Sequence, residues 1–308
     1  MNTTSLRGTW TLSKIQENPA PGEPSPSPAA KDLPPVPMTI PGDNYSALMQ
    51  AGLMADPYYA FNEQEALWAG RCGWLIRRRF QWKKEEGSTA CYLCMERADT
   101  FFTVSINGHE AGRGDNYFRL WRFDVTDLLQ DGENEIAIAF ASAEVEAQKI
   151  AGTLPYPIPF TRYDVVSPHR NLVRRIQCAA GWDWGPCLMT SGIYGDIYLE
   201  QVQDISFQSV SVQTVPLYED DRAGIWQLTA SVRCRCEHAG EKKFQVELSG
   251  MALSIRQQFA GRLPAGDGSF SFTMQVHAPE LWKSADELNP DGVPPGQAPR
   301  TNRLYTLS

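Results

Sequence analysis

The sequence lacks the features that mark membrane and exported proteins. None of its apolar runs approaches the roughly 18 residues that a membrane-spanning helix requires. Residues 1–10 contain no apolar stretch of the kind found in a signal peptide. The seven cysteines are an odd number, and a chain of 308 residues does not need disulfides to be stable. We therefore expect a cytoplasmic, reducing setting and no membrane partner.

Clustered positive charge is also scarce. The 28 Lys and Arg against 36 Asp and Glu give a formal net charge of -8, and the longest basic run is Arg77–Arg79. Nucleic-acid binding needs clustered positive charge to neutralise phosphates, so we expect no nucleic-acid partner. Nine Trp and eleven Tyr are, by contrast, more than a core requires. Their flat faces are typical of proteins that bind sugars.

Most of the chain alternates apolar and polar residues with a period of two, the pattern of a strand with one buried face. The clearest example runs from residue 226 to residue 236, and residues 136–140, 244–248 and 270–276 repeat it. Many short strands separated by turn residues predict an all-β protein built of β-sandwiches. The length and a change of pattern near residue 200 predict two domains, residues 1–200 and 201–308.

Two kinds of segment depart from the alternation. Residues 17–37 hold eight prolines among Ala, Ser and Gly, and we expect them to form an extended surface loop inserted in the first domain. Helical spacing is confined to residues 45–53 and to a short segment that Ser142 is predicted to cap, ending near Ile150.

The cysteines allow a metal-site interpretation and a structural one. Cys91 and Cys94 have the spacing of zinc ligands and could combine with Cys234 and Cys236 into a four-thiolate site. However, Cys234 and Cys236 occupy apolar positions of the clearest strand, whereas zinc ligands of this type lie on turns. We favour the structural interpretation, in which the thiols are small buried side chains, and expect no metal and no cofactor.

Residues for nucleophilic or acid–base catalysis are few. No Gly-x-Ser-x-Gly motif occurs, and no histidine pair has the spacing of metal ligands. Glycoside hydrolysis uses two carboxylates. Glu63 in a loop and Glu135 in a turn leading into a strand are the candidates, but no second carboxylate must face either. We therefore assign no catalytic residue to this chain. Residues 112–115, Gly-Arg-Gly-Asp, are expected to form a surface turn.

The most informative segment is residues 181–186, Gly-Trp-Asp-Trp-Gly-Pro. In an extended stretch Trp182 and Trp184 would point to one side and Asp183 to the other, with turns at both ends. For the tryptophans, core packing is favoured over sugar contact. For Asp183, contact with a sugar is favoured over a loop-capping role, because each carboxylate oxygen can accept a hydrogen bond from a hydroxyl. Asp183, Trp182 and Trp184 are the candidate substrate-binding residues.

At this motif the chain resembles the β-mannosidase branch of glycoside hydrolase family 2. The motif is followed by Ser-Gly-Ile-Tyr at 191–194 and Asp-Ile-Tyr-Leu-Glu at 196–200. The resemblance continues, more weakly, to residues 281–282 and 304–307. Other matches lie in order along the first 200 residues: Leu6–Trp10, Ile40–Gly42, Ala51–Leu53, Asp56–Tyr59, Asn62–Glu63, Val104–Gly108, Phe123–Thr126 and Gly132–Asn134.

This resemblance implies a jelly-roll, galactose-binding-like sandwich followed by an immunoglobulin-like β-sandwich. It also implies a mannoside-type carbohydrate as partner, and catalytic glutamates in a (β/α)8 barrel downstream of both domains. The chain shows no strand–helix alternation of the barrel type. Two departures stand out. Ala179 and Ala180 replace larger residues, which alters the expected pocket shape, and a Pro- and Gly-rich insertion at 284–300 affects the expected contact of Trp282.

The leading hypothesis is that this chain is the non-catalytic N-terminal part of a β-mannosidase-like exo-glycosidase. On this hypothesis the full-length protein hydrolyses terminal β-mannosides by a retaining mechanism, and the chain alone is inactive. The chain would supply one wall of the sugar pocket, with Asp183 binding hydroxyls. The alternative is a free-standing carbohydrate-binding module without hydrolase activity.

Overall fold

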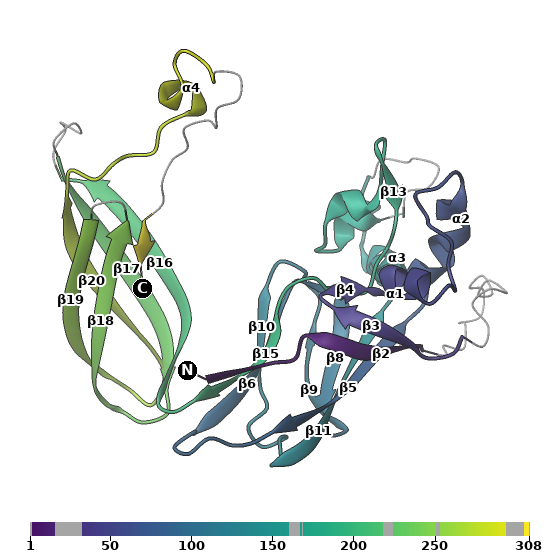
Figure 1. The fold of residues 1–308 in the computed structure, drawn as a ribbon, viewed down its shortest axis with the longest axis horizontal. Helices are drawn as coiled ribbons and strands as arrows, with labels where there is room; N and C mark the ends of the chain where they lie inside the picture. The colour runs from purple at the N-terminus through teal and green to yellow at the C-terminus, as the bar shows by residue number, and fades with distance from the viewer. Residues whose placement is uncertain are drawn as a thin grey trace. The chain divides into compact units, whose positions relative to one another are not determined.

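The computed structural model describes residues 2–15, 33–159, 167, 169–217, 224–250, 253–293 and 305–307. The chain divides into two compact units, Met1–Gln203 and Asp204–Ser308, which we call unit 1 and unit 2 (Figure 1). Antiparallel strand ladders make up both units, which confirms the all-β prediction. Most of the predicted proline-rich loop lies outside the described residues. Its last two residues, however, begin a strand rather than ending a loop.

Two antiparallel sheets supply the core of unit 1. The six-stranded sheet has the order β3 (Val36–Ile40), β2 (Gly8–Lys14), β5 (Trp74–Trp82), β11 (Gly132–Ala141), β8 (Phe101–Ile106) and β9 (His109–Gly114). The four-stranded sheet has the order β1 (Asn2–Ser5), β15 (Ile197–Val202), β6 (Ala90–Glu96) and β10 (Leu120–Asp124). A small third sheet joins β4 (Gly42–Asp43), β14 (Gly192–Ile193) and β7 (Ala98–Asp99).

The core of unit 1 follows directly from the period-two pattern. Ile136, Ile138 and Phe140 of β11 are buried and share one cluster with Leu93 of β6 and Leu199 of β15. Burying each such side chain contributes about 1.5–3 kcal/mol. These residues therefore hold the two sheets together, as expected for a sandwich.

A two-residue turn joins β8 to β9. Asn107 and Gly108 have φ angles of 51° and 84°, as a hairpin turn of this length requires. The segment from Gly112 to Gly114 is strand rather than surface turn. Glycine fits this strand because a side chain at Gly112 would collide with the Phe123 ring.

Short helices lie at one end of unit 1. Asp43 caps α1 (Asn44–Gln50), and the predicted Ser142 cap of α3 (Ala143–Thr153) is confirmed by a 3.2 Å hydrogen bond from the Val145 backbone N–H. The helices α2 (Asn62–Ala66) and η2 (Leu67–Arg71) lie between α1 and β5 in the chain. Figure 1 shows α1, α2 and α3 gathered near strand β13 (Gly185–Cys187) at this end.

Unit 2 is a further β-sandwich of two three-stranded sheets. One has the order β16 (Ile205–Pro216), β17 (Ile225–Cys236) and β20 (Gly266–His277), and the other β19 (Leu253–Leu263), β18 (Gly240–Gly250) and β21 (Thr306–Leu307). The predicted strand at 226–236 is β17, whose alternate residues are buried. Within the expected insertion after Trp282, a capping box of Ser284 and Glu287 starts the short helix α4 (Ala285–Leu288). Residues 294–300 of that insertion lie outside the described residues.

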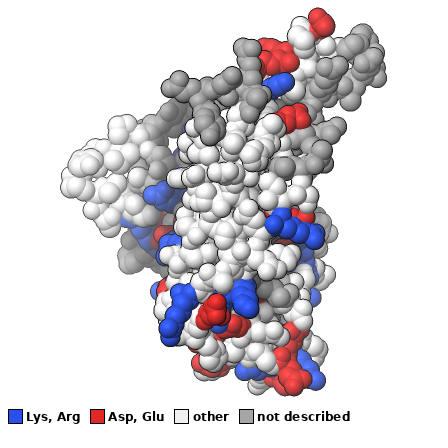
Figure 2. All heavy atoms as spheres, turned by 90° about the vertical axis from the view of Figure 1, so that its left-hand side faces the viewer, with Lys and Arg blue, Asp and Glu red and all other residues white. Residues whose placement is uncertain are grey.

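Charge is mixed on the face of the molecule shown in Figure 2. Among the described residues of this face, Lys and Arg side chains lie in small groups beside Asp and Glu side chains, without an extended positive area. In the described ranges, the helices are too short or too polar to cross a membrane.

Candidate functional site

The Trp-Asp-Trp motif forms the tip of a small β-hairpin. Strand β12 (Ala180–Trp182) pairs with β13, with Ala180 opposite Cys187 and Trp182 opposite Gly185. Asp183 and Trp184 are therefore the two turn residues. The chain reverses between the tryptophans, so the predicted alternation of side chains along an extended stretch is wrong.

The three candidate side chains are exposed at this tip. Trp182 is 39% exposed, Trp184 is 72% exposed, and Asp183 is also exposed. Core packing of the two tryptophans, which the residues alone favoured, is therefore wrong. A two-residue turn carries its side chains away from the sheet, and no strand covers them in the described part of unit 1. The hairpin tip thus exposes one carboxylate, which lies between the two tryptophans in the sequence.

Arg170 packs against strand β12 of the hairpin. Its guanidinium lies 4.6 Å from the centre of the Trp182 ring and donates a hydrogen bond to the Gly181 carbonyl oxygen. Cation–π contact of this kind contributes about 0.5–2 kcal/mol, more where water is excluded, and Arg170 is only 7% exposed. The Gln177 amide in turn donates to the carbonyl oxygens of Arg170 and Val173, both at 3.1 Å. The segment that precedes the hairpin is thus held in one conformation.

A buried ion pair fixes the chain just before and just after the hairpin. Arg175, just before β12, donates to Asp99 of β7 at 2.8 Å and to Thr190 at 3.2 Å. Thr190, just after β13, donates to the same Asp99 oxygen at 2.9 Å. The side chains of Arg175 and Asp99 are 1% and 4% exposed. Because the pair is desolvated, its geometry is tightly defined, and the hairpin stands on a rigid base.

The other carboxylate candidates take structural positions. Asn62 begins α2 and donates to the Asp56 carbonyl oxygen at 2.9 Å, which places Glu63 in the first turn of a short helix. Glu135 lies within β11 rather than in the turn before it, and its carboxylate pairs with the exposed Arg79 at 3.6 Å. Asn134 is buried and donates to the Gln130 carbonyl oxygen at 2.7 Å. The Glu135 carboxylate is therefore part of a surface ion pair.

Six of the seven cysteines are buried, and Cys178 is partly exposed. Burial raises the pKa of Cys91 to about 12 and the pKa values of Cys94 and Cys187 to about 11. These thiols stay protonated at neutral pH, which fits the structural interpretation. Cys91 and Cys94 lie in unit 1, whereas Cys234 and Cys236 line a small core cluster of unit 2.

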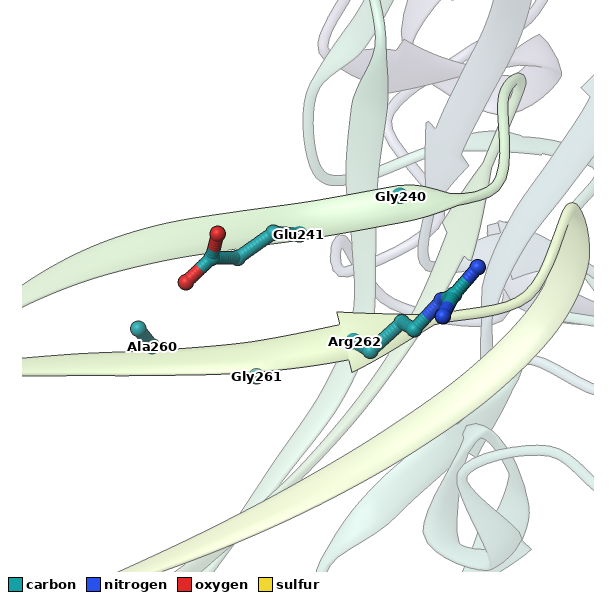
Figure 3. A pocket seen from close by; sticks show the side chains of 5 residues that line it. All are labelled: Gly240, Glu241, Ala260, Gly261 and Arg262. Carbon is teal, nitrogen blue, oxygen red and sulfur yellow. The ribbon is translucent and has the colours of Figure 1, made fainter.

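A shallow hollow in unit 2 is a poor sugar site. It has a volume of about 360 Å³ and lies between β18 and β19, lined by Gly240, Glu241, Ala260, Gly261 and Arg262 (Figure 3). The side chains of Glu241 and Arg262 point away from each other in this view. Sugar sites combine an apolar or aromatic surface with converging polar groups, and the lining residues supply neither.

Sequence reasoning found the tip of the hairpin but missed its base. Arg170, Arg175 and Gln177 were not among the candidate residues. Their signal was weak: three arginines and a glutamine lie in a short stretch, residues 170–177, before the motif. The part played by Asp99 had no local signal, because its partner lies 76 residues away in the sequence.

The sequence relationships agree with this architecture. The family described as glycosyl hydrolase 2 galactose-binding domain-like matches residues 10–195, which include the whole hairpin and its base. The chain belongs to this family. Beta-mannosidase B of Aspergillus fumigatus is 30% identical over 257 residues, covering 80% of this chain and 28% of that enzyme. The β-mannosidase of Bos taurus is 33% identical over 170 residues, or 54% of this chain and 19% of the relative.

Solved structures extend the likeness over both units. The crystal structure of a β-D-mannosidase from Dictyoglomus thermophilum matches the entire chain with a TM-score of 0.79 at 26% identity. It covers 34% of that protein. An exo-chitosanase from Amycolatopsis orientalis has the same fold, with a TM-score of 0.59 at 17% identity. The chain thus corresponds to the N-terminal part of β-mannosidase relatives and spans about a third or less of their length.

Removing the buried carboxylate should destabilise unit 1 strongly. We expect Asp99→Ala to lower its free energy of unfolding by about 3–5 kcal/mol, because Arg175 would remain buried and unpaired. Asp196→Ala is the matched control, since it breaks the exposed pair with Arg7 and should cost about 1 kcal/mol or less. Urea denaturation followed by tryptophan fluorescence measures both. Equal costs for the two variants would contradict an anchoring role for Asp99.

Thiol reactivity should single out Cys178. In the folded chain at pH 8, we expect only this thiol to react rapidly with Ellman's reagent. A thiol whose pKa is about 11, such as Cys94 or Cys187, is about 0.1% thiolate at that pH, and burial blocks access as well. Cys178→Ser should abolish the rapid phase, and unfolding in urea should release the buried thiols. A rapid phase that persists in Cys178→Ser would show that another thiol is accessible.

Proposed function

We propose that this chain is the non-catalytic, sugar-contacting part of a β-mannosidase-like exo-glycosidase that hydrolyses terminal β-mannosides. In this proposal the tip of the β12–β13 hairpin supplies one wall of the sugar pocket. The observation that carries it is the exposure of Trp182, Asp183 and Trp184 on a turn whose base is buried and fixed. Exposed tryptophans are costly to solubility, and a rigid support beneath them favours a binding role.

The chemistry of the tip suits a sugar. The Asp183 carboxylate can accept hydrogen bonds from two neighbouring hydroxyls, one at each oxygen. A Trp ring offers an apolar face for the C–H side of the sugar ring. An exo-acting enzyme must enclose the non-reducing end of its substrate, and a protruding hairpin is well shaped to close one side of such a pocket. Fixed groups bind without paying ordering entropy at the moment of reaction.

Bond cleavage itself is assigned to another part of the protein. A retaining glycosidase needs an acid and a nucleophile about 5–5.5 Å apart across the anomeric carbon. Asp183 stands between two tryptophans at a surface turn, and Glu135 is paired with Arg79. We therefore place the two catalytic glutamates in a (β/α)8 barrel downstream, in a protein of the length of the mannosidase relatives.

One observation also favours a second function. Trp184 is 72% exposed, as the aromatic residues of free-standing carbohydrate-binding modules are. A module of this kind binds sugar without a barrel. It differs from the leading proposal in one measurable respect, which is the affinity of the chain alone for mannosides.

In the full-length protein, Asp183→Ala should reduce kcat/KM for an aryl β-mannoside about 100-fold. The reason is that two charge-assisted hydrogen bonds to the sugar are lost, each contributing about 1.5 kcal/mol or more. Asp127→Ala, which removes an exposed carboxylate after β10, is the control and should leave kcat/KM unchanged. Steady-state kinetics measures kcat/KM for both variants. Unchanged kcat/KM in Asp183→Ala would remove the hairpin from the site.

The 308-residue chain alone should hydrolyse no aryl β-mannoside and bind mannose with a Kd in the millimolar range or weaker. One carboxylate and one aromatic wall leave most hydroxyls in water, so little binding energy is gained. Isothermal titration calorimetry and an aryl-mannoside assay measure the two quantities. Micromolar affinity that is lost in Trp184→Ala would favour the binding module instead.

A further inference from the structure

Strand β16 carries apolar side chains on a face that should be buried. Phe207, Val210 and Val212 pair with Cys234, Val232 and Ala230 of β17, and paired residues of antiparallel strands point to the same side of the sheet. The three β17 residues are at most 5% exposed. Their β16 partners are 46%, 54% and 46% exposed, respectively. The core of unit 2 is therefore uncovered along one edge.

In the opposite sheet, one edge of β18 is paired with a neighbouring strand over only a short part of its length. Strand β18 pairs with β19 along its whole length, from Gly240 to Gly250. On its other edge, β21 pairs only at Leu248 with Leu307 and at Ser249 with Thr306. Among the described residues of unit 2, no strand accompanies the stretch from Gly240 to Glu247 on that edge. Unpaired backbone N–H and C=O groups on this edge can accept another strand.

The exposed face of β16 and the unpaired part of the β18 edge lie across the sandwich from each other. The sheets have the orders β16–β17–β20 and β21–β18–β19, and β20 packs against β19. The place beside β18 where β21 begins therefore lies across the sandwich from β16. At the start of the strands the two sides already meet, because the Phe207 and Phe244 rings are 6.4 Å apart and Lys242 pairs with Asp204 at 2.6 Å. The uncovered strip follows directly from this contact.

We propose that the polypeptide following Ser308, in a protein of the length of the mannosidase relatives, continues β21 along β18 and covers Phe207, Val210 and Val212. Continuity with the existing β21–β18 pairing argues for this occupant, because it requires no change of direction or register. The relatives provide the length: the chain spans 28% of the Aspergillus enzyme and 34% of the Dictyoglomus protein. This proposal does not depend on the sugar-binding role of unit 1.

The register of β21 on β18 determines which residues after Ser308 would face the core of unit 2. Leu307 lies opposite Leu248, so the first and third residues after Ser308 would lie opposite Val246 and Phe244. Val246 is buried and Phe244 packs on the Phe270 ring, so both mark the core side. The first and third residues after Ser308 should therefore be apolar, and the second should be polar.

The test compares the 308-residue chain with a chain extended by the ten residues that its coding DNA specifies after Ser308. We expect extension to slow hydrogen exchange of the β18 amides that point away from β19 by about tenfold or more. We also expect it to lower the binding of a dye specific for exposed apolar surface, and to raise the unfolding midpoint of unit 2 by about 4 °C or more. An unchanged exchange rate, or a stop codon directly after Ser308, would overturn the proposal.

Two controls separate this occupant from others. Inserting one Thr after Ser308 in the extended chain reverses its alternation, so the added protection should disappear. If that variant is equally protected, the proposed register is wrong. A second copy of the chain is the competing occupant. Light scattering that shows a dimer of the 308-residue chain, converted to monomer by Val210→Lys, would replace our proposal with self-association.

Discussion

The ion pair between Arg175 and Asp99 connects the sandwich of unit 1 to the loop region at its end. Asp99 belongs to β7, which pairs with β14, and Thr190 between β13 and β14 donates to the same carboxylate oxygen. Arg175 approaches from the segment that leads into β12. One desolvated charge pair thus fixes the chain both before and after the hairpin. Such a pair adds little net stability, but breaking it is costly, so it specifies one conformation.

Rigidity at the base permits exposure at the tip. Arg170 lies against Trp182 and binds the Gly181 carbonyl oxygen, so the first tryptophan is held on its inner side while its outer side stays accessible. Asp183 and Trp184 extend beyond it. A tip of this kind loses little conformational entropy on binding, which is the physical basis for placing it in a sugar pocket.

Much of the fold could be predicted from local pattern alone. Strand β17 and the Ser142 cap of α3 appear as expected, because alternation and capping depend on neighbours in sequence. The exposure of Trp182 and Trp184 could not be predicted this way. The alternation rule assumes a continuous strand, whereas Asp183 and Trp184 form a turn. The Arg175–Asp99 pair was also beyond sequence reasoning, since it depends on two distant segments meeting in three dimensions.

The difference between local pattern and tertiary contact also explains why residues 112–114 form a strand. A Gly-Arg-Gly-Asp sequence is typical of turns, but tertiary packing decides here, because the Phe123 ring fills the space that a side chain at Gly112 would need. Local propensity is overruled where a close approach of neighbouring elements selects glycine. In unit 2, apolar side chains of β16 pair with buried residues of β17, yet the described residues leave these β16 side chains about half exposed.

In our proposal, Asp183 contacts the sugar in a protein of the length of the mannosidase relatives. A crystal structure of that full-length protein with a mannose-configured inhibitor would show whether this contact exists. We expect both Asp183 carboxylate oxygens within about 3.2 Å of sugar hydroxyls, with the Arg175–Asp99 pair unchanged beneath the hairpin. An inhibitor bound in the barrel, with the hairpin tip turned away from it and only water at Asp183, would show that Asp183 does not contact the sugar.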